Sequence, residues 1–352
     1  MKNMYFFCAL LIAGQLWAQE PSLPAGLGGS EPSLPQGLGS ESGEERSENH
    51  SVESWKEKLP FELSGFMDTR WGHRLRSDPL QDPISIAEFR LHHELEKDWK
   101  EVHVKYSADF LYDPVWDAVD LNLNSGTSWF DLREAHAVFR PFRFMDIKIG
   151  RQILTWGTGD LIFINDLFPK DWVSFFVGRD LVYLKAPSDA IKLALFSDVA
   201  NLDIIYTPQF DSDRYISGQR ISFYSQGAHS LQGQNAPISV QDQEQWFSDD
   251  EISIRLYRSI KASTIALYYY RGFWKSPAGF EPNLGKYTFP ELSVYGASVR
   301  GPFANGIAYV EGGYYDSMKD REGTNPLIRN SELRVLGGYE KEIFEETTLG
   351  VQ

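Results

Sequence analysis

The residues best suited to chemistry lie in one stretch, Gly150–Asp189, where charges of both signs are interspersed with glycine and proline. Lining a pore, such a set would sort solutes by the sign of their charge and by hydrogen bonding. Alternatively, the charges pair with one another and hold the stretch in place, and the two roles are compatible. The cations are Arg151, Lys170 and Arg179, and the carboxylates are Asp160, Asp166, Asp171 and Asp180.

The same stretch is also rich in large apolar residues, from Leu161 to Ile164 and again from Phe168 to Phe176. Gly157 and Gly159 permit a sharp reversal of the chain. Its turn residues would interrupt a strand ladder, so it cannot face lipid if the protein spans a membrane. We therefore expect it to fold inward as a plug or constriction.

Catalytic signatures are absent from the sequence. It has no Gly-x-Ser-x-Gly elbow, cysteine–histidine metal spacing, P-loop or dinucleotide fingerprint. His92 and His103 fall on one predicted face of adjacent strands, which is weakly suggestive of a metal pair, but a mixed-charge lumen explains them better. We expect no enzyme activity, no catalytic residue, no metal and no cofactor.

Alternating apolar and polar residues predict strands along most of the chain. In Val102–Tyr112, for example, Val104 and Tyr106 fall on one face while His103 and Lys105 fall on the other. The pattern predicts twelve complete strands and one partial strand. They are Phe61–Trp71, Ala87–Lys97, Val102–Tyr112, Ser128–Arg140, Met145–Leu154, Ala190–Ser197, Asn201–Pro208, Glu251–Ile260, Ser263–Phe273, Glu291–Gly301, Gly306–Ser317, Ser331–Ile343 and the opening of another at Thr347–Gln352.

A soluble sandwich would show the same alternation, so other features must decide the class. The polar faces carry dense charges of mixed sign, aromatic residues stand near strand ends, and the segments run to about ten residues, the length of a tilted crossing strand. Short connections alternate with long ones such as Asp211–Asp250 and Lys275–Pro290, which we expect to be outer loops. The predicted fold class is an all-β, transmembrane, antiparallel up-and-down β-barrel of twelve or more strands with an internal constriction segment.

The N-terminal region predicts export. Residues 1–18 have the layout of a cleaved secretory signal peptide, with an apolar run and a cleavage point after Ala18. Residues 19–54 are rich in Pro, Gly, Ser and Glu and repeat the motif of Glu20–Gly28 at Glu31–Gly39. We expect this segment to be disordered. Residues 55–352 would form the barrel. Gln352 ends inside a strand without a terminal aromatic residue, so we expect the chain to be a fragment from which one or more closing strands are missing.

Several residues resemble a broad, mostly uncharacterised family of Gram-negative outer-membrane barrels that are similar to substrate-specific porins. The resemblance rests on Gly150-Arg151-Gln152, Trp156-Gly157, Asp160, Asp166 and Pro169, and it is best over Asp131–Asp189. In that family, a strand ending in Gly-Arg-Gln leads into a folded-in segment that narrows the lumen. The resemblance implies an architecture more than an activity.

We therefore expect a porin-like channel in the Gram-negative outer membrane for passive passage of small polar or amphipathic solutes, with residues 150–189 as its constriction. Outer-membrane lipid and the barrel-assembly machinery are the expected partners, with a possible periplasmic partner for the N-terminal repeat. The net charge of −15 argues against nucleic acid. A structural or partner-binding barrel and, less favoured, a barrel hydrolase remain alternatives. The candidate solute-binding or constriction residues are Arg151, Gln152, Asp160, Asn165, Asp166, Lys170 and Arg179.

Overall fold

The computed structural model describes residues 60–115, 121–159, 161–225, 227–344 and 347–352 of the chain. The predicted signal peptide (1–18) and the Pro/Gly/Ser/Glu-rich segment (19–54) lie outside these residues. Within the described part of the chain, no helix is both long and apolar enough to cross a membrane.

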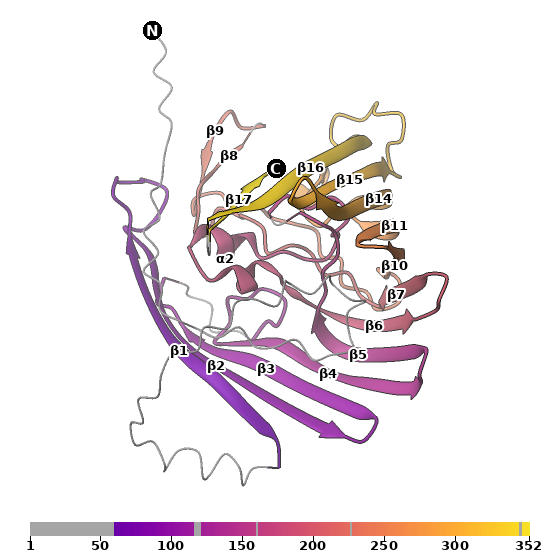
Figure 1. The fold of residues 1–352 in the computed structure, drawn as a ribbon. Helices are drawn as coiled ribbons and strands as arrows, with labels where there is room; N and C mark the ends of the chain where they lie inside the picture. The colour runs from indigo at the N-terminus through magenta and orange to yellow at the C-terminus, as the bar shows by residue number, and fades with distance from the viewer. Residues whose placement is uncertain (1–59, 116–120, 160, 226, 345–346) are drawn as a thin grey trace. The chain divides into compact units, whose positions relative to one another are not determined.

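One antiparallel sheet of thirteen strands dominates the structure, and its strands follow one another in chain order. Figure 1 shows this order from β1, in indigo, to β17, in yellow, with helix α2 on the concave side of the sheet. The strands are β1 (Glu62–His73), β2 (Ile84–Trp99), β3 (Val102–Tyr112), β4 (Phe130–Phe142), β5 (Met145–Ile153), β6 (Pro187–Leu195), β7 (Asn201–Thr207), β10 (Glu251–Ile260), β11 (Ser263–Phe273), β14 (Glu291–Phe303), β15 (Gly306–Ser317), β16 (Glu332–Phe344) and β17 (Thr347–Val351).

The connections differ strongly in length at the two ends of the strands. At one end, which we call the short rim, tight turns such as those at Lys100 (φ 50°) and Lys261 (φ 56°) join neighbouring strands. These positive φ angles suit the tight turns that match strand twist. At the other end, the long rim, residues 154–186, 208–250 and 274–290 form much longer connections. Two separate hairpins lie in these long connections: β8 (Phe223–Ser225) with β9 (Ser230–Gln232), and β12 (Gly279–Glu281) with β13 (Lys286–Thr288).

The two faces of the sheet have opposite character because successive side chains of a strand point to opposite sides. On the outer face, large apolar side chains such as Leu267 and Val310 are about half exposed. On the face that we call the inner face, charged side chains such as Arg90 and Glu311 are only 1% exposed. Charged residues are almost never buried this fully in proteins unless they are paired.

The predicted all-β, antiparallel up-and-down architecture with twelve or more strands and an internal segment is confirmed. Four strands have the predicted boundaries: Val102–Tyr112, Glu251–Ile260, Ser263–Phe273 and Gly306–Ser317. Phe66, which breaks the alternation of its strand, lies on the inner face and stacks on His92 with the ring centroids 4.7 Å apart. The two small hairpins in the long connections were not predicted.

The sheet is open between its first and last strands. Within the described residues, β1 pairs only with β2 and β17 pairs only with β16. The outer edges of β1 and β17 therefore present unpaired backbone N–H and C=O groups.

Candidate functional site

Residues 154–186 leave the sheet after β5 and fold over the inner face before they return to it at β6. We call these residues the inner segment. It contains the short helix α2 (Trp172–Phe176) and a 3-10 turn, η1 (Leu181–Leu184). Asp171 and Asp180 cap these elements, since their carboxylates accept hydrogen bonds from the backbone N–H groups of Ser174 (2.7 Å) and Val182 (3.0 Å).

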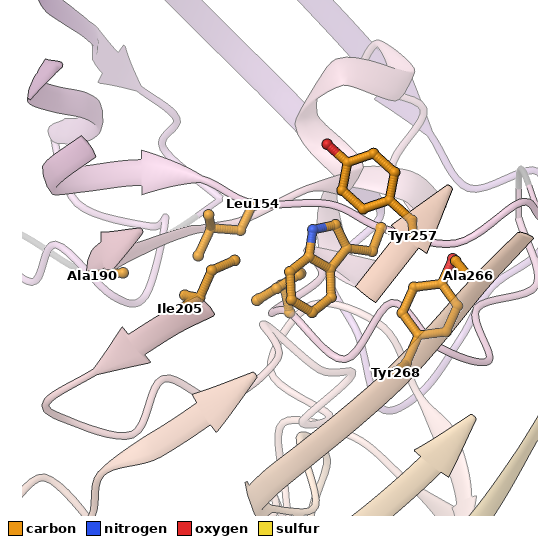
Figure 2. Packing of buried hydrophobic residues seen from close by; sticks show 8 residues of the cluster. Leu154, Ala190, Ile205, Tyr257, Ala266 and Tyr268 are labelled. Atoms are coloured by element: carbon orange, nitrogen blue, oxygen red, sulfur yellow. The ribbon is translucent and has the colours of Figure 1, made fainter. Parts of the chain in front are cut away.

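The first part of the inner segment packs on an apolar floor at the inner face. Trp156 and Phe168 meet edge to face with centroids 5.0 Å apart. Figure 2 shows the cluster that they join, with Ile205 of β7 and Tyr257 of β10 among its members. Burial of these side chains places residues 154–168 against the middle strands of the sheet.

The part of the inner segment that contains Thr158, Ile164 and Asn165, which we call its tip, is attached to β15 through Glu311. This carboxylate accepts hydrogen bonds from the Asn165 backbone N–H (2.7 Å), the Thr158 N–H (2.8 Å) and the Thr158 hydroxyl (2.7 Å). The Tyr315 hydroxyl, also on β15, donates to the carbonyl of Ile164. One buried carboxylate therefore satisfies three donors of the tip.

Two glycines make room for this attachment. Gly296 of β14 and Gly313 of β15 are directly opposite in the ladder and leave a notch on the inner face. A methyl group at Gly296 would lie only 1.6 Å from Asn165 Oδ1, and one at Gly313 would lie 3.0 Å from Ile164 Cγ2. The tip approaches β14 and β15 so closely because neither position carries a side chain.

The second part of the inner segment is attached to strands β2, β3 and β4. Arg179 binds Glu88 of β2, with Nε 3.0 Å from Oε2. The Tyr183 hydroxyl donates to Asp109 of β3 (3.3 Å), and the Arg90 guanidinium lies 4.1 Å from the centre of its ring. These side chains are buried, so each charge depends on the partner that it meets across the interface.

Arg133 of β4 completes this attachment. Its Nη2 donates to the backbone carbonyls of Val182 and Lys185, both at 3.0 Å. A guanidinium that binds carbonyl groups fixes the backbone of the inner segment directly.

Residues 208–222 also lie against the inner segment, and Arg214 is their main point of contact. Its guanidinium binds Asp131 of β4 at 2.8 Å and Asp171 of the inner segment at 3.2 Å. Nε donates to the carbonyl of Asn124 at 3.0 Å, and any side chain at Gly126 would collide with the guanidinium. Burial acts to lower the pKa of Arg214, but the carboxylates of Asp131 and Asp171 outweigh it, so the pKa is raised and the cation persists.

Asp211 and Asp213, near the start of residues 208–222, both have raised side-chain pKa values. Burial raises the pKa of Asp211 to about 6, and the nearby Glu251 adds to this effect while Lys275 opposes it. Burial also raises the pKa of Asp213, although a hydrogen bond from the Lys170 backbone N–H (2.8 Å) opposes the change.

The structure places the predicted site residues in or beside the inner segment, where the cations are buried and paired. Arg151 binds the carbonyl of Leu132 (2.7 Å) and Asp189 (3.1 Å), and Lys170 binds Asp166 (2.8 Å). The side chains of Arg151, Lys170 and Arg179 are 3%, 3% and 4% exposed. Pairs of this kind hold the segment in place, and contact of these residues with a solute stays a prediction.

Three other predicted residues complete the comparison. Gln152 is fully buried and donates to the carbonyl of Ala190 at 2.9 Å. Asn165 lies in the glycine notch. Asp160 falls outside the described residues.

Sequence reasoning missed the residues that hold the inner segment. On the sheet these are Glu88, Arg90, Arg133 and Glu311, and Arg214 of residues 208–222 joins Asp171 of the segment to Asp131 of β4. The alternating pattern places Glu88 and Arg90 on the inner face. It does not show which charges of that face contact the inner segment and which do not. The opposed glycines at Gly296 and Gly313 were a usable signal, since glycine in a strand often marks a close approach of another backbone.

No protein-family model and no curated protein matches the chain. Solved structures resemble it distantly. Salmonella typhi OmpF in complex with daunomycin is 9% identical, with a TM-score of 0.38 over 80% of this chain and 72% of that chain. A mutant of the Rh. blastica porin is 10% identical, with a TM-score of 0.38 and coverage of 82% and 81%. Acinetobacter baumannii OccAB4 is 10% identical, with a TM-score of 0.33 and coverage of 80% and 76%. No residue role or activity is carried over from likenesses at this distance.

We expect Glu311→Gln to release the tip of the inner segment. The amide replaces an acceptor with a donor that faces N–H groups, which costs on the order of 1–3 kcal/mol. Hydrogen exchange of the peptide containing Thr158 and Asn165 should then be about tenfold faster or more. Glu332→Gln on β16 is the matched control and should leave that peptide protected. Unchanged protection in Glu311→Gln would contradict the attachment.

We expect Arg214→Met to destabilise the fold by about 3–5 kcal/mol, because it leaves the buried carboxylates Asp131 and Asp171 without their cation. Arg329→Met, which removes a half-exposed arginine paired with Glu332, should cost less than about 1 kcal/mol. Thermal unfolding followed by circular dichroism compares the two variants. Equal losses in both would show that Arg214 is not a structural centre.

Proposed function

We propose that the protein is an outer-membrane channel for passive passage of small solutes, in which residues 150–189 form the constriction. The two faces of the sheet support a membrane location. Apolar side chains on the outer face suit hydrocarbon, while a charged inner face suits a water-filled lumen. A spanning sheet must have every backbone group paired, so this proposal requires partners for the free edges of β1 and β17.

The double attachment of the inner segment is the observation that carries the constriction. Its tip binds Glu311 on β15, and its later residues bind Glu88 on β2 and Arg133 on β4. These strands stand far apart in the order of the sheet. A segment held at both places lies across the polar face, so a solute moving along that face has to pass it.

Export by the signal peptide and residence in the outer membrane of a Gram-negative cell belong to the same proposal. Contact with lipid would use the outer face, and insertion would require the barrel-assembly machinery. Arg151 of β5 and the segment's Lys170 and Arg179 are each paired with a carboxylate, so we propose that they act mainly by keeping the segment in position.

The test is ion conductance of the full-length protein in a planar lipid bilayer. We expect discrete single-channel steps, and we expect deletion of residues 161–172 to increase the step size several-fold, because the deletion removes the tip and its apolar support. Deletion of residues 282–285, the turn between β12 and β13, is the control and should leave the step size nearly unchanged.

Two results would contradict the proposal. A folded wild-type protein that never conducts would exclude a channel. A deletion of residues 161–172 that folds but conducts like the wild type would remove the inner segment from the permeation path.

A further inference from the structure

Two lysines stand directly opposite each other on the inner face, outside the inner segment. Lys148 of β5 and Lys192 of β6 are partners in the ladder. Their neighbours Ile149 and Ile191 point to the outer face, where each is 44% exposed. Opposed residues on one face of a sheet have Cβ atoms about 5 Å apart, and like charges in such a pair destabilise it. Stability of the sheet alone gives no reason for this pair.

The carboxylates near these lysines do not neutralise them fully. Lys148 Nζ lies 3.9 Å from Glu134, and Lys192 Nζ lies 3.8 Å from Asp203, both longer than a hydrogen bond. Glu134 is shared, since Lys105 also approaches it, at 3.4 Å. The side chains of Lys148 and Lys192 are 16% and 19% exposed, so neither is sealed from solvent.

A third cation lies close by on the same face. Arg255 of β10 is the ladder partner of Asp203, and its guanidinium carbon is 4.3 Å from the centre of the Tyr257 ring. Its Nε has no hydrogen-bond partner within the described part of the chain. Lys148, Lys192 and Arg255 therefore have only Asp203 and the shared Glu134 as nearby carboxylates, so the positive charge here is incompletely balanced.

In the proposed channel, the two lysines lie on the path between the short rim and the constriction. On β5, Lys148 lies between the short rim and Gln152, after which the chain leaves for the inner segment. On β6, Lys192 likewise lies between the short rim and Ser188, the ladder partner of Gln152. The lysines thus stand on the wall between the short rim and the constriction.

We propose that Lys148 and Lys192 form a binding subsite for small oxyanions, the carboxylate or phosphate groups of solutes, on the short-rim side of the constriction. The proposal rests on the channel function above and adds the class of solute. Because opposed residues have Cβ atoms about 5 Å apart, both lysine side chains can reach the oxygens of a single oxyanion. Arg255 extends the site toward β10.

The experiment compares the wild type with Lys148→Gln/Lys192→Gln in planar bilayers. In a potassium chloride gradient, loss of both charges should shift the reversal potential toward cation selectivity. Inorganic phosphate should reduce the wild-type chloride current, and its half-blocking concentration should rise about tenfold in the double variant. Acetate, tested separately, shows whether a carboxylate binds as phosphate does, and block by either oxyanion supports the subsite.

Matched variants separate the subsite from general charge. Lys148→Arg/Lys192→Arg should retain phosphate block, and Lys319→Gln, which removes an exposed charge at the long rim, should change neither readout. If the double variant conducts with unchanged selectivity and unchanged block, the subsite is refuted while the channel stands. If the folded wild type does not conduct, the channel proposal and the subsite fall together.

Discussion

Burial of charge on the inner face is the constraint on which the rest of this structure depends. Glu88, Arg90, Asp109 and Glu311 are each 3% exposed or less, and an isolated ion buried to that extent costs several kcal/mol. Within the sheet, Arg90 pairs with both Glu88 and Asp109. The inner segment adds Arg179 for Glu88, the Tyr183 hydroxyl for Asp109, and backbone N–H groups for Glu311. The segment and the sheet therefore stabilise each other, because each supplies hydrogen-bond partners to buried polar groups of the other.

The same constraint explains why a second connection, residues 208–222, reaches the same place. Asp171 of the inner segment and Asp131 of β4 are both buried, and Arg214 is the cation that lies between them. Gly126 leaves the space that the guanidinium occupies. Strand β4, the inner segment and the connections that contain Asn124 and Arg214 thus meet at the Arg214 guanidinium. The opposed lysines on β5 and β6 differ from this network, because their carboxylates are shared and more distant.

The strands could be predicted from the sequence, since alternation with a period of two is a local property that each strand displays by itself. The four strands predicted with correct boundaries each have one end at a tight turn of the short rim, as Ser263–Phe273 does. It missed the hairpins β8–β9 and β12–β13, whose strands of three residues are too short to show a period. The inner segment was located because its apolar and turn residues break the alternation.

The contacts of that segment could not be predicted, because they depend on how the sheet curves. Asn165 and Glu311 are far apart in the chain, and only the curvature brings them together. Sequence spacing grouped Arg151, Lys170 and Arg179 as one charged set. In the structure they bind separate partners, Asp189, Asp166 and Glu88.

The placement of the inner-segment tip against β14 is the central claim, and a disulfide between Asn165→Cys and Gly296→Cys tests it most directly. A β-carbon at Gly296 would lie 2.6 Å from Asn165 Cγ, close to the geometry that a disulfide needs. The only cysteine of the chain, Cys8, lies in the predicted signal peptide and does not interfere after cleavage. Mild oxidation of the folded protein should link this pair, whereas Asn165→Cys with Ser107→Cys on β3 should remain reduced. Failure of the first pair to link, or linkage of the second, would contradict the account.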